Sequence, residues 1–235
     1  MQLHLDKVIS LNIGKKKSVL SPVKLSLTAA DQVQKKLILA IGLKELKSGE
    51  RVTEIGLAEI LNVSRVPVRE AMQRLLTFGV LQTGEGPGMR ILNYGERRVR
   101  DLMEIRKAVE RIMFDRVLSL TDSKEELIEN LQEIVHHMAI VATDVDTVEL
   151  SSIDLEFHRT IAYYSNNSIA KKVWEGLAPH LMIVFCGNLS ILSKRSGEVQ
   201  DHQNLIKFIE NGDHKNIDVI LNEHFSTVWS NSTFT

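Results

Sequence analysis

The sequence contains a single cysteine, Cys186, among its 235 residues. One thiol cannot form an internal disulfide, and its apolar neighbours Ile183, Val184 and Phe185 favour a packing role over a chemical one. Nothing in the cysteine content therefore calls for an oxidising environment, and the expected compartment is the reducing cytoplasm.

The sequence also lacks any apolar run of the roughly 18 residues that a membrane-spanning helix needs. Its N-terminal segment has no compact apolar stretch followed by a small-residue cleavage site. These absences predict a soluble, cytoplasmic protein that does not have a membrane among its partners.

A strong overall charge is absent as well, since the formal net charge is -1. Cutting the chain after Tyr94 uncovers an asymmetry, with 14 basic and 8 acidic residues before the cut and 15 and 22 after it. The positive N-terminal part favours contact with a polyanion, although chance unevenness of solvated charges would give the same counts. The charge pattern therefore needs support from a motif.

The periodicity of apolar residues divides the chain into three parts. Residues 1–24 show no convincing period and form an expected N-terminal arm that carries Lys15, Lys16 and Lys17. Residues 25–94 combine short amphipathic helices with a glycine-tipped hairpin. Residues 95–235 show only helical periodicity, with breaks that predict six helices. The expected fold is mainly α, a winged helix-turn-helix followed by an all-α antiparallel bundle.

The most informative motif lies between residues 54 and 92. A short helix over 54–61 and a turn over 62–64 precede a second helix, which Ser64 can cap and which has Pro67 in its first turn. Arg65 and Arg69 are four residues apart and share a face opposite the apolar one. Residues 84–88, rich in glycine, separate two short strands and are typical of a wing.

Arginines at the start of such a helix can read the major groove of DNA. A guanidinium group makes paired hydrogen bonds to guanine, and an arginine one turn later can reach a base or a phosphate. The alternative is that Arg65 and Arg69 form surface ion pairs with Glu70 or Glu59. The order of short helix, turn, capped helix and wing favours the DNA-reading interpretation.

The segment GERVTEIGLAEILNVSRVPVREAMQRLLTFGVLQ resembles the DNA-binding domain of the GntR family of bacterial transcription regulators. The resemblance covers about residues 27–93 and is carried above all by VSRVPVRE. It implies that three residues contact operator DNA, namely Ser64, Arg65 and Arg69.

This sequence departs from the family pattern at three positions. Ile55 stands where the family usually has a basic residue, and Val66 replaces a common threonine. Glu85 at the tip of the wing would repel a phosphate. The lysines at positions 15–17 could compensate by contacting the DNA backbone.

A second constellation consists of one aspartate and three histidines. Asp154 and His158 lie four residues apart on a predicted helix, and His202 and His224 belong to the last two helices, His202 at the start of its helix. Three imidazoles and a carboxylate suit zinc or a similar divalent metal. The spacing by itself favours structural histidines, because such pairs are common.

The segments DLEFHRTIA, DHQNLIKFIENGD and LNEHF resemble the three ligand-bearing helices of the FCD effector domain, found in the FadR-type branch of the GntR family. The likeness covers about residues 96–232 and six helices rather than seven, as in the shorter VanR-like form. It implies a divalent metal, zinc with nickel or manganese as alternatives, held by Asp154, His158, His202 and His224.

The same resemblance assigns Arg106, in MEIRKAVE, to the effector, a small organic acid whose carboxylate would meet both the metal and the guanidinium group. The alternative for Arg106 is an ion pair with Glu110 on an exposed helix face. The function expected from these features is a homodimeric transcription regulator, a repressor, and not an enzyme. Two other hypotheses are a metal-dependent hydrolase and a helical interaction module.

Overall fold

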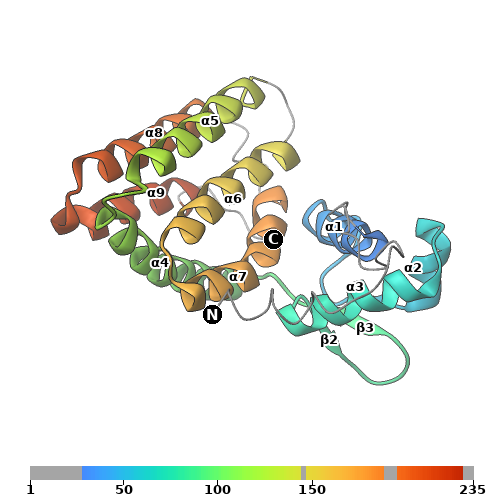
Figure 1. The fold of residues 1–235 in the computed structure, drawn as a ribbon. Coiled ribbons are helices and arrows are strands. Elements are labelled where there is room, and N and C mark those ends of the chain that lie inside the picture. The colour runs from blue at the N-terminus through green and yellow to red at the C-terminus, as the bar shows by residue number, and fades with distance from the viewer. Residues whose placement is uncertain (1–27, 144–146, 188–194, 230–235) are drawn as a thin grey trace, which may run out of the picture.

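The computed structural model describes residues 28–143, 147–187 and 195–229. The expected arm over residues 1–24, with its three lysines, lies outside the described residues. We call residues 28–94, where the sequence predicts DNA binding, the DNA-reading unit, and the described residues from 95 onward the bundle. Figure 1 shows these two parts beside each other, with α7 of the bundle next to α1.

The DNA-reading unit contains three helices and a small sheet: α1 (Ala29–Gly42), β1 (Arg51–Val52), α2 (Glu54–Leu61), α3 (Arg65–Phe78), β2 (Leu81–Thr83) and β3 (Met89–Ile91). The antiparallel sheet has the order β1-β3-β2, and β1 is a strand that the sequence pattern did not predict. The three- and four-residue spacing of apolar residues over 27–46 predicts a helix there that Ser48 and Gly49 end, but α1 ends earlier, at Gly42.

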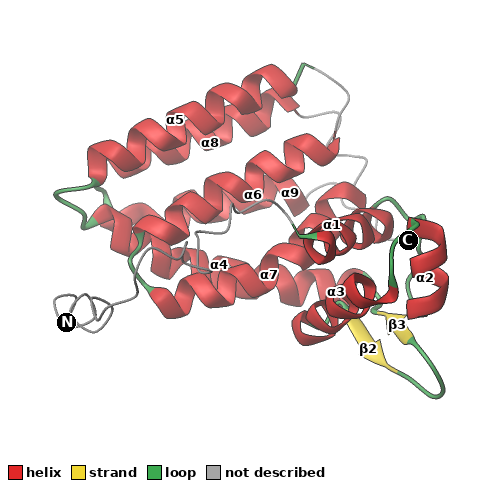
Figure 2. Ribbon diagram, turned by 45° about the vertical axis from the view of Figure 1, so that its right-hand side comes forward, coloured by secondary structure: helices red, strands yellow, loops and turns green. Residues whose placement is uncertain are grey.

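Six helices make up the bundle within the described residues: α4 (Glu96–Leu118), α5 (Lys124–Val141), α6 (Thr147–Tyr164), α7 (Ser168–Gly187), α8 (Arg195–Asn211) and α9 (Ile217–Trp229). The prediction of a mainly α fold, a winged helix-turn-helix and then a helical bundle, is confirmed (Figure 2). Gly197 predicts a break between helices, but it lies inside α8, so this break was misplaced. Consequently His202 sits two turns into its helix and does not open it.

Apolar side chains from both parts join in one core, with Val33 and Leu37 of α1 and Ile183 of α7 among its members. A Cβ atom placed on Gly42 would lie 2.9 Å from the Cβ of Cys186 and 3.2 Å from the Ile183 carbonyl oxygen. Only glycine permits this approach of α1 to α7. Cys186 is buried there, in agreement with the packing role predicted for it.

The boundary predicted near residue 94 lies between β3 and α4, and the division of the chain into three parts remains a prediction. In the described part of the chain, no helix combines the length and the apolar character needed to cross a membrane.

Candidate functional sites

The helix-turn-helix is set up by local side-chain chemistry at the ends of α2. The Thr53 hydroxyl accepts a hydrogen bond from the Gly56 amide at 3.1 Å and so caps the start of the helix. Asn62 ends α2 in the left-handed conformation at φ 52°, which asparagine tolerates better than most residues. The chain can therefore turn within a few residues and begin α3.

Ser64 occupies the N-cap position of α3 with extended backbone angles, but its side chain makes no capping hydrogen bond. The expectation that Ser64 caps the helix is thus met by its position and not by its hydroxyl group. Pro67 lies in the first turn as predicted, where its missing N–H breaks no helical hydrogen bond.

Arg65 and Arg69 project from the exposed face of α3, and each side chain is 56% exposed. Both contact Glu54 of α2, with Arg65 Nη2 at 3.4 Å from Glu54 Oε2 and Arg69 Nε at 3.1 Å from it. The alternative interpretation, in which Arg65 and Arg69 form surface ion pairs, predicted Glu59 and Glu70 as partners, and these partners are wrong. An exposed pair contributes about 0–1 kcal/mol, so these arginines can exchange Glu54 for an external anion at little cost.

The predicted wing is present as β2, β3 and the loop between them (Figure 2). Gly88 adopts φ 97°, and a Cβ atom there would lie 2.5 Å from the Val52 carbonyl oxygen of β1, so that glycine is required. Arg51 Nη2 donates a hydrogen bond to the Glu85 carbonyl oxygen at 2.8 Å. Arg51, which no sequence motif singled out, therefore ties the wing tip to β1.

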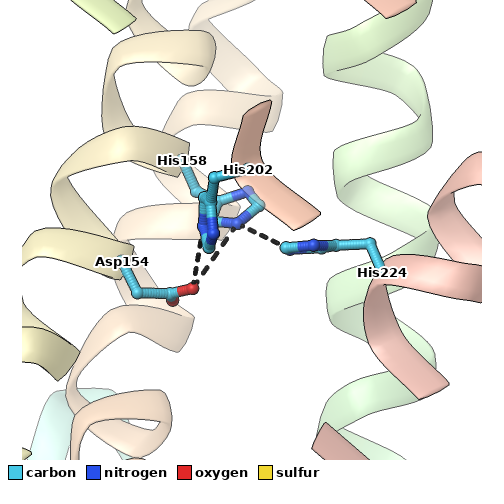
Figure 3. Close-up of side chains that lie close together, drawn as sticks. All are labelled: Asp154, His158, His202 and His224. Atoms are coloured by element: carbon cyan, nitrogen blue, oxygen red, sulfur yellow. Dashed lines mark hydrogen bonds and ion pairs between the residues drawn. The ribbon is translucent and has the colours of Figure 1, made fainter. Parts of the chain in front are cut away.

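The four residues predicted to bind a metal come together in the bundle. Asp154 and His158 extend from successive turns of α6, while His202 comes from α8 and His224 from α9 (Figure 3). One ligand atom from each residue lies within 4.8 Å of all the others, and all four residues are buried. The structure thus brings together the complete predicted set.

Close contacts with oxygen atoms on the outer side of two rings favour one orientation of each ring. His158 Nδ1 lies 2.5 Å from Glu110 Oε2, and His202 Nδ1 lies 2.8 Å from the Glu198 carbonyl oxygen. The Glu198 carbonyl oxygen can only accept, so Nδ1 carries the hydrogen in His202. The Glu110 carboxylate beside His158 Nδ1 favours a hydrogen on that atom as well. When the rings are neutral, both Nε2 lone pairs consequently face the centre of the cluster, as in metal-ligating histidines.

Distances at the centre of the cluster match a shared cation. His202 Nε2 lies 3.2 Å from Asp154 Oδ1, and His158 Nε2 lies 3.1 Å from His224 Nε2. Two ligands bound at about 2.1 Å to one tetrahedral ion would lie roughly 3.4 Å apart. A lone pair facing a carboxylate oxygen is unfavourable unless a proton or a metal ion lies between them, so the residues present fit a metal.

The pKa values in the cluster reflect competition between burial and charge. Burial lowers the pKa of His158, and the Glu110 carboxylate opposes this only in part. Burial also holds the pKa of His224 well below its ordinary value, with His202 adding to the effect. Burial acts to raise the pKa of Asp154, but Arg106 and His202 outweigh it and lower that pKa. Burial acts to lower the pKa of His202, but the Asp154 carboxylate and the Glu198 carbonyl oxygen outweigh it and raise that pKa. Metal binding requires an ionised aspartate and neutral rings, so a bound ion would replace the proton that Asp154 favours on His202.

Arg106 forms the predicted pair with Glu110, but in a different setting from the exposed helix face considered in the alternative. Arg106 Nε lies 2.6 Å from Glu110 Oε1, and both residues are 0% exposed. Trp174 of α7 adds a hydrogen bond to the same oxygen at 3.2 Å. Although burial acts to raise it, the pKa of Glu110 falls to about 2 because Arg106 and His158 favour the carboxylate.

One edge of the Arg106 guanidinium group carries a nitrogen atom that has no hydrogen-bond partner. The group lies between two aromatic rings, 5.2 Å from the centroid of Phe185 and 4.9 Å from that of Phe225. Its Nη2 atom is buried without a hydrogen-bond partner, and Asp154 Oδ2 lies 3.6 Å from it. A buried donor left in this state costs free energy, which an added acceptor would recover.

Of two residues that orient the ligands and the arginine, sequence reasoning named Glu110 only as a surface partner of Arg106 and missed Trp174. Glu110 links Arg106 to His158, and Trp174 supports Glu110. The four-residue spacing from Arg106 to Glu110 is a usable signal, but by itself it indicates only a surface pair. Trp174 gives no signal in the sequence.

A winged helix-turn-helix joined to a helical bundle with a buried cluster of possible metal ligands is typical of one class, the DNA-binding transcriptional regulators. Two family models match the chain: "Bacterial regulatory proteins, gntR family" over residues 29–91 and "FCD domain" over residues 101–227. The chain belongs to the GntR family of DNA-binding transcriptional regulators, in the FadR-like branch with an FCD domain, and this is a family of regulators and not of enzymes.

Among the relatives is the gluconate operon transcriptional repressor of Bacillus subtilis, 25% identical over 188 residues, which cover 78% of this chain and 76% of that protein. The probable D-xylose utilization operon transcriptional repressor of Paenarthrobacter nicotinovorans is 25% identical over 203 residues, covering 84% and 85%. The solved structure of Escherichia coli McbR/YncC shares the fold, with a TM-score of 0.66, 20% identity and coverage of 87% and 98%.

Proposed function

We propose that this regulator is a homodimeric repressor whose affinity for operator DNA is set by a small organic acid bound in the bundle. In this proposal, Ser64, Arg65 and Arg69 contact the operator. Asp154, His158, His202 and His224 hold a divalent metal ion, and Arg106 binds a carboxylate of the effector. Two relatives named as operon repressors support the repressing role.

The observation that carries this proposal is the buried Nη2 atom of Arg106, which makes no hydrogen bond beside a cluster that fits a cation. A metal ion supplies open coordination positions for a carboxylate or hydroxyl group when it is bound. Arg106 adds directed hydrogen bonds to the same carboxylate. Together these groups favour a small acid over a neutral ligand.

Zinc is the metal that three imidazoles and one carboxylate suit best, with nickel and manganese as alternatives. Metal analysis of the purified protein is expected to give about one ion per chain. The metal content should fall in His202→Ala and stay the same in His214→Ala, which removes an exposed histidine paired with Asp115. Equal metal content in both variants would contradict the assignment.

The effector is tested by a thermal-shift screen of small organic acids on metal-loaded protein. A ligand that binds the native state raises the unfolding temperature. The response is expected to vanish with chelator and in Arg106→Ala, and to weaken in Arg106→Lys, which keeps the charge and loses the paired geometry. A response that persists in Arg106→Ala would remove Arg106 from the effector site.

Operator binding is tested by gel shift with genomic fragments. Specific binding by the wild type, lost in Arg65→Ala, is the expected result, and an effective acid should change that binding. An effector alters operator affinity only if it favours one arrangement of the DNA-reading units over another. Unchanged binding by Arg65→Ala would contradict the assignment of α3 as the reading helix, the helix that contacts the operator.

A further inference from the structure

His180 of α7 lies where the bundle meets the DNA-reading unit, and it contacts two segments of that unit. Its Nε2 atom lies 2.7 Å from the carbonyl oxygen of Phe78, and its Nδ1 atom lies 2.7 Å from the hydroxyl oxygen of Tyr94. His180 is 9% exposed. Phe78 is the last residue of α3, the reading helix, and Tyr94 lies in the segment between β3 and α4.

The direction of both hydrogen bonds is set by the chemistry of the partners. A carbonyl oxygen only accepts, so Nε2 of His180 carries the hydrogen and donates it to Phe78. Burial lowers the pKa of His180 and thus favours the neutral ring, whose Nδ1 then accepts from the Tyr94 hydroxyl group. The imidazole is therefore used at both nitrogens.

The contact with Phe78 also provides a hydrogen-bond donor for a carbonyl group at the end of the reading helix. The last carbonyl groups of an α-helix have no partner within the helix and require an outside donor. Here that donor comes from the bundle, so the end of α3 is fixed in relation to α7. The close approach of Gly42 to Ile183 and Cys186, three and six residues beyond His180, holds α7 against α1 as well.

We propose that His180 is a positioning residue, which fixes the orientation of the reading helix by bonding the α3 terminus and Tyr94 to α7. The same helix carries Phe185 against Arg106, about 7.5 Å further along its axis. A shift of α7 would thus move both Phe185 beside Arg106 and the contact with the reading helix. The positioning role of His180 does not depend on the identity or existence of an effector.

The test uses full-length protein with spin labels on Glu59→Cys in α2 and Glu129→Cys in α5, two exposed positions, while the buried Cys186 stays in place. Labelled chains are mixed with excess unlabelled protein so that distances within one chain dominate. His180→Phe keeps an aromatic ring and removes both hydrogen bonds. His180→Gln is the matched control, because its amide nitrogen can still donate to Phe78 and its amide oxygen can still accept from Tyr94.

A narrow distance distribution is expected for the wild type and His180→Gln, and a broader one for His180→Phe. Affinity for a genomic fragment that the wild type binds is expected to fall roughly fivefold in His180→Phe, in line with one net hydrogen bond, and less than twofold in His180→Gln. A wild-type distribution and wild-type affinity in His180→Phe would overturn the proposal.

Tyr94→Phe provides a second route should His180→Phe fail to fold, since it removes only the hydroxyl group. We expect an intermediate broadening of the distance distribution, because the bond to Phe78 remains. A distribution in Tyr94→Phe identical to that of the wild type would contradict the proposed use of both nitrogens. None of these measurements needs a metal or an organic acid, so failure of the proposed function leaves them interpretable.

Discussion

Two groups of arginine–carboxylate pairs in this protein use the same chemistry in opposite environments. On the reading helix, Arg65 and Arg69 pair with Glu54, and both arginine side chains are 56% exposed. In the bundle, Arg106 pairs with Glu110, and both are 0% exposed. Water screens the exposed pairs, which therefore contribute little to the free energy of unfolding. The buried pair is shielded from water.

In the proposed function, this difference separates an exposed surface that meets DNA from a buried cluster that holds a metal ion and a small acid. Surface arginines can release Glu54 and bind DNA without leaving a buried charge behind. A buried charge pair must be complete, because the loss of one partner leaves an unsolvated ion. Four predictions, in order of decreasing expected effect, put this contrast to the test.

The largest effect is expected for Arg106→Ala, which leaves Glu110 buried without its main countercharge. The free energy of unfolding should fall by about 3–5 kcal/mol, as measured by urea denaturation. Arg111→Ala on the same helix is the matched control, because Arg111 pairs with Asp218 at 2.9 Å while both side chains are about half exposed. We expect a loss of less than about 1 kcal/mol there. Equal losses of unfolding free energy in Arg106→Ala and Arg111→Ala would contradict the difference between the buried and the exposed pair.

Removal of the metal should have the next largest effect on stability. At a free metal concentration of about 100 times Kd, a bound ion adds roughly 2.7 kcal/mol to the free energy of unfolding. Chelation is therefore expected to lower the unfolding temperature of the wild type and to leave that of His202→Ala unchanged. A chelator effect of equal size in both proteins would place the metal elsewhere.

At the reading helix the effect should fall on binding and spare stability. Arg65→Ala and Arg69→Ala are each expected to cost about 1–3 kcal/mol of operator binding, a roughly 5- to 150-fold loss of affinity. The affinity is measured by fluorescence anisotropy with a genomic fragment that the wild type binds. Arg111→Ala is the control and should bind this fragment with wild-type affinity. An unfolding free energy that drops in step with affinity would mean that these arginines are structural.

The smallest effect concerns the two polar residues that precede helices α2 and α3. Ser64→Ala should change the free energy of unfolding by less than about 0.5 kcal/mol, since the hydroxyl group makes no capping bond. Thr53→Ala should cost about 1 kcal/mol, because Thr53 caps α2. Thermal unfolding of both variants tests this order. A larger loss for Ser64→Ala would show that its hydroxyl group serves the helix.

Much of the local structure could be predicted from the sequence because its signals are local. The bounds of α2, the proline in the first turn of α3 and the glycine-tipped wing follow from residue preferences within a few positions. The strand β1 was missed because two residues carry no periodic signal. The start of α8 was misplaced because a glycine inside a helix resembles a helix end.

By itself, the sequence determined which residue types were available and which helix faces they share, so that Asp154 and His158 were a predictable pair. The resemblance to a family extended this to His202 and His224. Only the tertiary structure decided that Arg106 and Glu110 are buried beside these ligands, and that His180 meets the end of the reading helix. Burial and long-range contacts depend on how helices distant in sequence pack together, and helical periodicity specifies a face without specifying what covers it.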